Sequence, residues 1–517
     1  MSQKSLETRF TNKIKSLQEI EALLESERQK GLRIIHCHGV FDLLHPGHIR
    51  HFREAKAQGD LLVVSITPDR FVNKGPGRPA FPEHLRLESI ASLADVDYVI
   101  LNDSPDAISA IQKIRPSLYV KGSEYADHAS DITGKITKEM LAVEQSGGKI
   151  FYTNDVVFSS SSLLNKFFDS IPKEVSDFLE KLKKKYSANT ILEKLEDLAK
   201  MKVLVIGDAI IDEYQYTEPM GQSGKGIHMV ARCQDKEIFL GGSFMIANHV
   251  AQFAKEVTLV TAIGRECPYA NFISHHLDPK VQPQYTILED SHTLVKKRYG
   301  IKDGKLLTKL FETYSGQEEP LRPSQATNIA NYLNKNAKFY DLILACDFGN
   351  GFTNPLLINA ISDTSAFLAL NAQTNSGNRG FNVVTNYRRA DYISLNEPEL
   401  RLSAHDRSSS LPGLAADICQ LMGASTLSVT RGVQGVLCYS SSGKHIRIPA
   451  FATNSVDRIG AGDAFLSLSS LCMAKKFPPV IGGFLGSLAA AMNVQMVGNQ
   501  EAIKKQQLCK YLIRLMK

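Results

Sequence analysis

The ten residues 39–48, Gly-Val-Phe-Asp-Leu-Leu-His-Pro-Gly-His, follow a strand-like run at 32–35 and come directly before a helical stretch at 49–58. At the start of a helix the backbone amides point outward and the helix dipole favours an anion. His45 and His48 are three residues apart at this position, so both rings can donate to one phosphate group. An isolated pair of this kind is more often a loop histidine and a helix cap, and a zinc site is the next alternative. Taken alone, the pair leaves these alternatives open.

Apolar runs and helical segments alternate after this stretch. Strand-like runs stand at 61–66, 98–101 and 118–120, and helical stretches at 83–94 and 105–115. Short apolar runs separated by helices are typical of βαβ units on a parallel sheet. The first part of the chain is therefore predicted to be a Rossmann-like α/β domain.

A second α/β region follows a polar, lysine-rich segment. Residues 170–199 have amphipathic helical character and no strand-like run, and the alternation returns from 203 onward. We expect a glycine- and alanine-rich helical region near 460–494 and strands at 203–207, 257–263, 342–346, 367–370, 392–395, 426–429 and 435–439. The predicted organisation is two domains, 1–169 and 200–517, joined by a helical linker, 170–199.

The composition excludes several classes of protein. The 517 residues are 43% hydrophobic and 22% charged, which is ordinary for globular domains. The formal net charge of +6 is mild, and the lysine-rich run at 181–185 is typical of a solvated helix face, so we expect no nucleic-acid partner. No stretch is apolar for long enough to span a membrane, and the first residues lack the apolar core of a signal peptide, so the expected location is cytoplasmic. The eight cysteines are scattered without CxxC pairs, which favours free thiols.

A second chemical signal lies at 457–465, Asp-Arg-Ile-Gly-Ala-Gly-Asp-Ala-Phe, directly before an apolar helix. Small residues at a helix start leave their amide N–H groups available to an anion, and the carboxylate of Asp463 can take a proton from an alcohol. Phosphoryl transfer to a hydroxyl requires both. The alternative is a close-packed turn with Asp463 as the helix cap.

The block at 39–48 resembles the HxGH signature of the cytidylyltransferase-like nucleotidyltransferases. Residues 74–79, 83–86 and 120–125 are similar to segments of heptose-1-phosphate adenylyltransferase domains. The resemblance implies attack by a sugar 1-phosphate on the α-phosphate of a nucleoside triphosphate, with His45 and His48 stabilising the phosphates. It also implies nucleotide contacts from Val40, Phe41, Ser160 and Ser161, and substrate contacts from Asp42, Lys74, Arg78 and Lys121.

The block at 457–465 resembles the GAGD signature of ribokinase-like carbohydrate kinases, whose α/β fold it implies for the second domain. In that family the aspartate is the general base, here Asp463, and the anion is held by the residues that precede it, here Gly460, Ala461 and Gly462. Other segments of the chain match the family in order and spacing. They imply sugar contacts from Asp208, Asp212, Gly241, Gly242 and Asn248, and nucleotide contacts from Thr430, Gly432, Gly435 and Asn493. Asn396 and Glu399 match an NxxE motif that organises Mg²⁺ and phosphate through water. Arg458 replaces the family's usual threonine, and either a charged acceptor or a surface salt bridge would explain it.

Together the two regions resemble the bifunctional heptose-7-phosphate kinases and heptose-1-phosphate adenylyltransferases of ADP-heptose synthesis, in reversed domain order. The resemblance implies an ATP- and Mg²⁺-dependent transferase that phosphorylates a sugar phosphate at its anomeric hydroxyl and then makes a nucleotide sugar for cell-envelope polysaccharide. We expect small-molecule substrates, no membrane partner, and a homodimer through the kinase domain. The alternatives are a different sugar, CTP in place of ATP, or a nucleotide-sensing regulator with one inactive domain. The intact His45, His48, Asp463 and NxxE set argues against the regulator.

Overall fold

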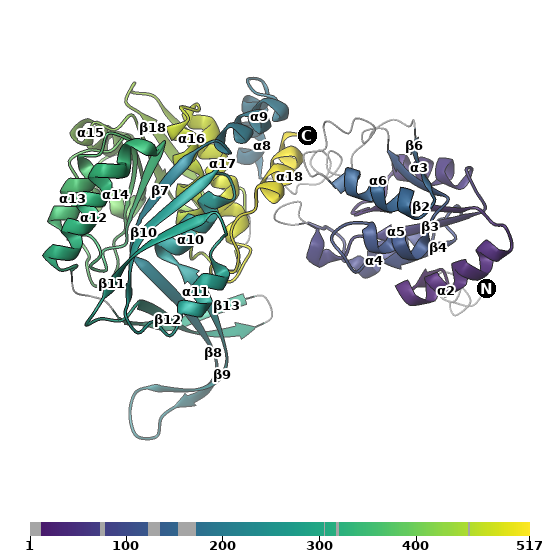
Figure 1. The fold of residues 1–517 in the computed structure, drawn as a ribbon, viewed down its shortest axis with the longest axis horizontal. Helices are drawn as coiled ribbons and strands as arrows, with labels where there is room; N and C mark the ends of the chain where they lie inside the picture. Colours follow the sequence, from purple (N-terminus) through teal and green to yellow (C-terminus); the bar gives the residue numbers. More distant parts are fainter. Residues whose placement is uncertain are drawn as a thin grey trace. The chain divides into compact units, whose positions relative to one another are not determined.

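The computed structural model describes residues 12–72, 78–122, 135–153, 172–303, 306–316, 320–452 and 455–517. The chain forms two compact units, Met1–Lys173 with Cys509–Lys517, and Glu174–Leu508. Both units are α/β, as predicted (Figure 1). None of the helices in the described ranges is long and apolar enough to cross a membrane.

The first unit contains a six-stranded parallel sheet with the order β1-β4-β3-β2-β5-β6. Its strands are β1 (Ile14–Lys15), β2 (Ile34–Gly39), β3 (Leu61–Ile66), β4 (Tyr98–Leu101), β5 (Leu118–Gly122) and β6 (Lys149–Thr153). The strand order reverses between β2 and β5, and doubly wound sheets bind ligands beyond the carboxyl ends of the strands at this switch point. The block at 39–48 begins at the carboxyl end of β2, so it lies at that point.

Helices cover the parallel sheet of the first unit and bury its apolar strands. They are α2 (Leu17–Gln29), α3 (Pro46–Lys56), α4 (Glu83–Ala91), α5 (Ile108–Ile114) and α6 (Lys135–Gln145). Ile35 of β2 and Phe52 of α3 belong to one apolar core, and Ile34 and Ile20 of α2 belong to another. Because successive residues of a strand face opposite sides, β2 is buried on both.

The second unit is built on a nine-stranded main sheet with the order β11-β10-β7-β14-β15-β16-β17-β18-β19. Its strands are β7 (Lys202–Gly207), β10 (Glu256–Gly264), β11 (Val281–Leu288), β14 (Leu342–Asp347), β15 (Phe367–Ala372), β16 (Tyr392–Asn396), β17 (Thr426–Thr430), β18 (Val436–Ser440) and β19 (His445–Ile448). The last two strands run antiparallel to their neighbours, and the rest are parallel.

Helices pack on both faces of the main sheet (Figure 1). One apolar core joins the strands to the helices α12 (Pro323–Asn336), α13 (Pro355–Ser362), α14 (Glu397–Ser403) and α15 (Leu411–Met422). The other helices of this unit include α10 (Gly242–Ala251), α11 (Ala270–His276), α16 (Ala461–Ala474) and α17 (Pro479–Asn493), while α18 (Lys505–Met516) ends the chain. In α16 and α17 most side chains are buried, which explains why these helices are apolar on every side.

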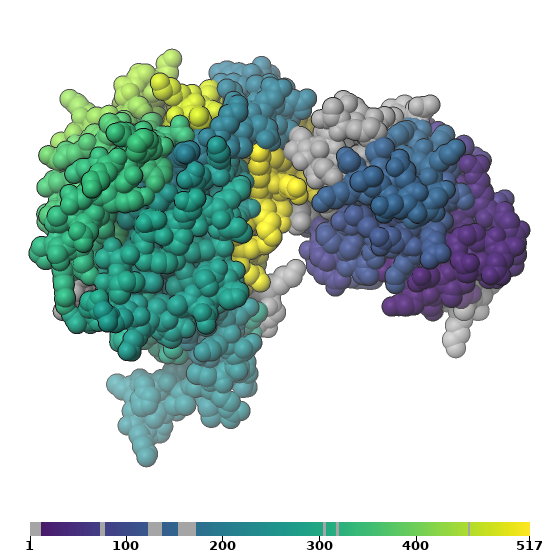
Figure 2. All heavy atoms as spheres, viewed as in Figure 1, coloured from purple at the N-terminus to yellow at the C-terminus, as the bar shows by residue number. Residues whose placement is uncertain are grey.

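A separate four-stranded sheet, called here the small sheet, has the order β13-β12-β8-β9. It consists of β8 (Ala209–Gln222), β9 (Met229–Gly241), β12 (Leu294–Asp303) and β13 (Leu306–Ser315). The chain passes from the main sheet to the small sheet at Asp208, between β7 and β8. The hairpin of β8 and β9 extends away from the rest of this unit (Figure 2), and none of these four strands was predicted from the sequence.

The segment predicted as a helical linker, 170–199, holds two helices, α8 (Lys173–Lys183) and α9 (Ala188–Leu198). Their apolar side chains are buried, among them Leu179 and Leu195. Phe178 of α8 packs against Phe451 and Phe484 at ring distances of 6.0 and 5.9 Å. The two helices are therefore packed parts of the second unit.

Candidate active sites

The predicted phosphate site of the first unit is formed where β2 ends and α3 begins. His45 is the N-cap residue in an extended conformation, and its ring stacks on that of His48 with centroids 3.8 Å apart. His45 is 6% exposed, and neither of its ring nitrogens has a hydrogen-bond partner among the described residues. Burial lowers the pKa of His45, so the ring is neutral at neutral pH. A buried imidazole with open nitrogens is suited to a ligand that supplies hydrogen-bond partners.

The turn before His45 is fixed by Phe41, which has a φ of 47° although it is not glycine. This left-handed conformation costs about 1–3 kcal/mol and is kept only where the surroundings impose it. The Phe41 ring contacts His48 edge-on at 5.3 Å and covers Gly39, where a Cβ would lie 2.9 Å from it. Only glycine therefore fits at 39, and the strained turn brings an aromatic ring against one of the two histidines.

A buried arginine holds the same turn from behind. Arg86 of α4 is 1% exposed and donates to the carbonyl of Val40 at 2.6 Å and to that of Thr67 at 2.9 Å, while it pairs with Asp69 at 2.6 Å. The sequence resemblance at 83–86 included this residue, but we did not predict it as a site residue. Arg86 is buried although its only salt-bridge partner among the described residues, Asp69, is partly exposed. This burial indicates that Arg86 positions the turn at Val40.

Charged residues predicted to contact the substrate are engaged with the protein in the structure. Asp42 pairs with Arg78 at 2.9 Å and accepts the amides of Ala80 at 2.6 Å and Phe81 at 3.2 Å. Lys121 pairs with Glu139 at 2.9 Å. Lys74, Ser160 and Ser161 lie outside the described residues, so their predicted roles remain predictions.

The second unit contains a cavity of about 580 Å³, called here the kinase cavity, lined by residues of both of its sheets. It brings together predicted residues from widely separated parts of the chain: Asp212, Gly242, Asn396, Glu399, Thr430, Gly460, Gly462 and Asp463. Asp463 is 8% exposed and lies in the first turn of α16. Its Oδ1 accepts a hydrogen bond from Nε2 of Gln373 at 2.9 Å.

Burial and the neighbouring Asp212 raise the pKa of Asp463 to about 7, although the Gln373 hydrogen bond and Lys296 oppose the rise. A carboxylate with a pKa near neutral can accept a proton during a reaction and release it afterwards. The position and the pKa of Asp463 therefore suit a general base.

The start of α16 forms an anion cradle. Gly460 is the N-cap residue with a φ of 80°, and a Cβ there would collide with Asn499. Ala461 is the first helical residue, and a Cβ on Gly462 would meet only open space, so the backbone at 460–462 is accessible from the kinase cavity. Free amides at a helix start favour a phosphate.

The glycine pair at the start of α10 lets the backbone approach the carboxylate of Asp212 and the backbone carbonyl of Asp208. A Cβ on Gly241 would lie 2.5 Å from Oδ2 of Asp212, and one on Gly242, whose φ is 54°, would lie 2.6 Å from the carbonyl of Asp208. Asp212 lines the cavity and pairs with Arg298. Asp208 instead accepts the amides of Phe348 at 2.9 Å and Phe352 at 3.3 Å, so its carboxylate supports a loop.

Asn396 and Glu399 form a reciprocal capping box at the start of α14, with both bonds at 2.8 Å. Burial raises the pKa of Glu399 to about 7. In the described part of the chain no cluster of three or more His, Cys, Asp or Glu side chains is placed to bind a metal. Both residues nevertheless line the kinase cavity, so they fit a hydrated Mg²⁺ held through its water ligands.

A larger cavity of about 1120 Å³, called here the outer cavity, shares Asn396, Thr430 and Arg379 with the kinase cavity. Gly432 also lines it, as do several arginines. A Cβ on Gly435 would collide with the backbone of β19, so this glycine has a structural role in the nucleotide-side loop. A basic cavity joined to the anion cradle offers space for the rest of a nucleotide.

Three residues singled out in the sequence do not line the kinase cavity. Asn248 lines a different cavity, and its amide bonds to the carbonyl of His276 and the amide of Asp278, both at 2.8 Å. Asn493 is fully buried, with its Oδ1 3.3 Å from the Cβ position of Gly460, and no described residue bonds to its amide. Arg458 is exposed and does not line the kinase cavity, so the structure does not support a role for it in acceptor charge.

Comparisons with known proteins agree with this division into two sites. Residues 36–167 match the model of the cytidylyltransferase-like family, and residues 200–506 match that of the pfkB family of carbohydrate kinases. The chain is similar to the bifunctional protein HldE of Syntrophotalea carbinolica, with 34% identity over 143 residues, 27% of this chain and 28% of that protein. The namesake protein of Geobacter metallireducens is 34% identical over 140 residues, 27% of each chain. The chain thus spans little more than a quarter of the length of these curated relatives.

Among solved structures, phosphofructokinase-2 from Escherichia coli in complex with potassium superimposes with a TM-score of 0.50 at 14% identity. The match covers 62% of this chain and 100% of that one. At this identity the likeness shows the fold alone. It agrees with the ribokinase-like fold expected for the second domain.

Proposed function

Because the chain belongs to the pfkB family of carbohydrate kinases, we propose that it phosphorylates a sugar phosphate at the anomeric hydroxyl and then converts the 1-phosphate into a nucleotide sugar. The product that we propose is ADP-heptose for cell-envelope polysaccharide, made in the cytoplasm with ATP as the donor in both steps. Between the two steps a separate phosphatase has to hydrolyse the phosphate that the acceptor carried at the start. The likeness to proteins called bifunctional and the match of 36–167 to the cytidylyltransferase-like family support the pairing of the two reactions.

The observation that carries the kinase half is the position of Asp463 beside the anion cradle in the kinase cavity. Asp463 takes the proton of the acceptor hydroxyl while the oxygen attacks the γ-phosphorus of ATP. The new O–P bond forms as the bond from the γ-phosphorus to its bridging oxygen breaks, and ADP leaves. The amides at 460–462 stabilise the charge on the transferred group, which is the main requirement of phosphoryl transfer.

Mg²⁺, when bound, would neutralise charge on the donor phosphates, and Asn396 and Glu399 would hold its water ligands. These residues start α14 at the border of the kinase cavity and the outer cavity. Thr430 and Gly432 would line the nucleotide in the outer cavity.

The nucleotidyltransferase half rests on the stacked histidines at the start of α3. An oxygen of the sugar 1-phosphate attacks the α-phosphorus of the nucleotide, and pyrophosphate leaves. No side chain has to form a covalent intermediate, because a phosphate is already a nucleophile and positioning supplies much of the rate. His45, neutral and without a described partner, has an N–H to donate to a phosphate oxygen.

The test is a panel of sugar phosphates incubated with the full-length protein and either ATP or CTP, with products identified by mass spectrometry. We expect heptose 1,7-bisphosphate from heptose 7-phosphate and ATP, and ADP-heptose with pyrophosphate from heptose 1-phosphate and ATP. A CDP-sugar, or a product from another sugar alone, would replace the proposed substrates while keeping the two reaction types. Absence of any phosphorylated or nucleotide product across the panel would contradict the proposal and favour the nucleotide-sensing regulator.

A further inference from the structure

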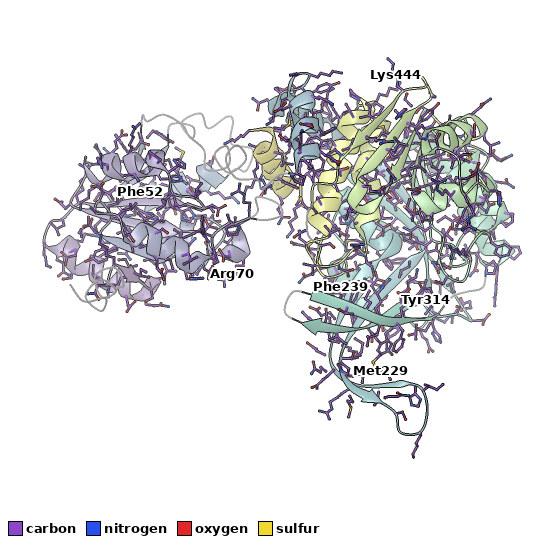
Figure 3. The ribbon with its side chains drawn as sticks, turned by 180° about the vertical axis from the view of Figure 1, so that it is seen from behind. Phe52, Arg70, Met229, Phe239, Tyr314 and Lys444 are labelled. Atoms are coloured by element: carbon purple, nitrogen blue, oxygen red, sulfur yellow. The ribbon has the colours of Figure 1, made fainter. Side chains whose placement is uncertain are left out.

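The small sheet presents a buried ammonium group to the kinase cavity. Lys296 of β12 is 8% exposed and lines that cavity. Within the described part of the chain its Nζ makes no hydrogen bond or salt bridge. It lies 4.8 Å from the centroid of the Tyr314 ring. Tyr314 belongs to the strand β13 (Figure 3). The sequence analysis did not identify Lys296.

Strand register shows why Asp212 makes no salt bridge with this lysine. Lys296 is paired with Asp212 of β8 and with Tyr314 of β13, so the three side chains share one face of the small sheet. Arg298, two residues further along, shares that face and pairs with Asp212 as well as with Glu312 at 3.2 Å. Arg298 therefore already pairs with Asp212. Lys296 makes no salt bridge among the described residues, although the charges of Asp208, Glu312 and Asp463 lie near enough to interact with its own.

A buried ammonium without a carboxylate partner is costly, and contact with one aromatic ring restores only part of the lost hydration. Burial lowers the pKa of Lys296, although the nearby Asp212 opposes this. An anion in the kinase cavity would supply the direct ion pair and the hydrogen bonds that the Nζ of Lys296 lacks among the described residues. The arrangement therefore indicates a ligand that brings negative charge to this side of the cavity.

The donor nucleotide is not the best source of that charge. Its phosphates are matched to the anion cradle at 460–462 and to Asn396 and Thr430, which belong to the main sheet and its helices. Lys296 belongs to the small sheet, beside Asp212, where the acceptor is expected. Sugar hydroxyls are neutral and do not require an ammonium group, whereas a phosphate monoester carries close to two negative charges at neutral pH.

We propose that Lys296 binds the phosphate group that the acceptor already carries, and so makes the second unit a kinase of sugar phosphates in preference to free sugars. This inference rests on the proposed kinase function and adds the residue that recognises the negative charge of the acceptor.

The test compares full-length wild type with Lys296→Met, Lys296→Arg and a matched control, Lys302→Met. Lys302 lies on the same strand and over the Tyr216 ring at the same 4.8 Å, but it is exposed and does not line the kinase cavity. The acceptors are heptose 7-phosphate and heptose, each with saturating ATP. Inorganic phosphate is added as a competitor of the acceptor, and its binding is also measured by calorimetry.

Loss of one buried charge-assisted hydrogen bond corresponds to roughly 10- to 100-fold in affinity. We expect Lys296→Met to raise KM for heptose 7-phosphate by about that factor, to weaken competition by phosphate, and to leave KM for heptose within about threefold of wild type. Lys296→Arg should retain most of the preference for the phosphorylated acceptor, and Lys302→Met should match wild type. If Lys296→Met does not fold, Lys296→Gln takes its place.

An equal rise in KM for both acceptors would overturn the inference, because Lys296 would then not distinguish a phosphorylated acceptor from a free sugar. An unchanged KM for heptose 7-phosphate would overturn it as well. If the wild type phosphorylates neither acceptor, the proposed function fails. The calorimetric comparison then decides the inference, and equal binding of phosphate by wild type and Lys296→Met would overturn it.

Discussion

Replacement of Asp463 by asparagine separates the two reactions of the chain. Asparagine keeps the shape of the side chain and can still accept the Gln373 hydrogen bond, which measures 2.9 Å in the structure, but it cannot take a proton. A positioned general base contributes about 10²–10⁴-fold, so kcat of the kinase step should fall by that factor while ATP still binds. The corresponding rise in the activation barrier is about 3–5 kcal/mol.

The assay is product formation from two starting sugars. The Asp463→Asn variant should make the nucleotide sugar at the wild-type rate from heptose 1-phosphate, because the first unit is untouched. It should make almost none from heptose 7-phosphate supplied with a sugar phosphatase, because that route needs the kinase. Equal yields from both sugars would refute the assignment of Asp463 as the base or the dependence of the first unit on the second for its substrate.

The pKa of Asp463, about 7, adds a pH test with a defined sign. The base works only when deprotonated, so the wild-type kinase rate should fall as the pH drops below about 7. Since the pKa of the folded state lies above the ordinary value, the protonated group favours folding, and this contribution is lost as the pH rises through about 7. The asparagine variant lacks that loss, so thermal unfolding should show it gaining stability over wild type between pH 5.5 and pH 8, by on the order of 1–4 kcal/mol. If the variant were less stable than wild type at pH 8, this would contradict the raised pKa of the buried Asp463 carboxyl.

Three further predictions concern the first unit and the point in the chain at which the second unit begins. His48→Ala should abolish pyrophosphate release while kinase turnover stays near wild type, and release at the wild-type rate would exclude His48 from the phosphate site. Arg86→Met should destabilise the first unit by about 2–4 kcal/mol, because buried acceptors lose a charged donor, and should lower nucleotidyl transfer at least about 10-fold, measured by unfolding and by product formation. The kinase rate is its internal control, and an unchanged nucleotidyl transfer rate would mean that the Val40 turn does not need this support. A fragment 172–517 should be soluble and active as a kinase, whereas 195–517 should unfold at a lower temperature, because it lacks α8 and cuts α9. Equal melting temperatures of the two fragments would show that these helices contribute nothing to the second unit.

The part of the fold in which strands and helices alternate could be predicted because its strands are buried on both faces. The runs predicted at 61–66 and 98–101 coincide with β3 and β4. The small sheet gave no such signal, since its strand β9 carries polar residues through Arg232–Glu237 and most of its side chains are exposed. A polar, exposed strand has neither the apolar run of a buried strand nor a regular alternation, and only its pairing with β8 reveals it.

The residues of the candidate kinase site also differ in how far the sequence predicts them. Asp463 and its cradle could be predicted because the cradle needs a glycine at 460, where φ is 80° and a Cβ would collide with Asn499, and this local requirement is visible in the sequence. Asn248 lies six residues after Gly242 on α10, and at 100° per residue it points about 240° around the helix from that glycine. Helical spacing alone therefore argues that the two do not face one cavity, and the motif match at Asn248 did not take this into account.

Lys296 is the opposite case, because a lysine two residues before an arginine is indistinguishable in sequence from the solvated face of an exposed strand. Its meaning depends on the register that sets it beside Asp212 and sets Arg298 to balance that carboxylate, and register between distant strands is not encoded in any local pattern.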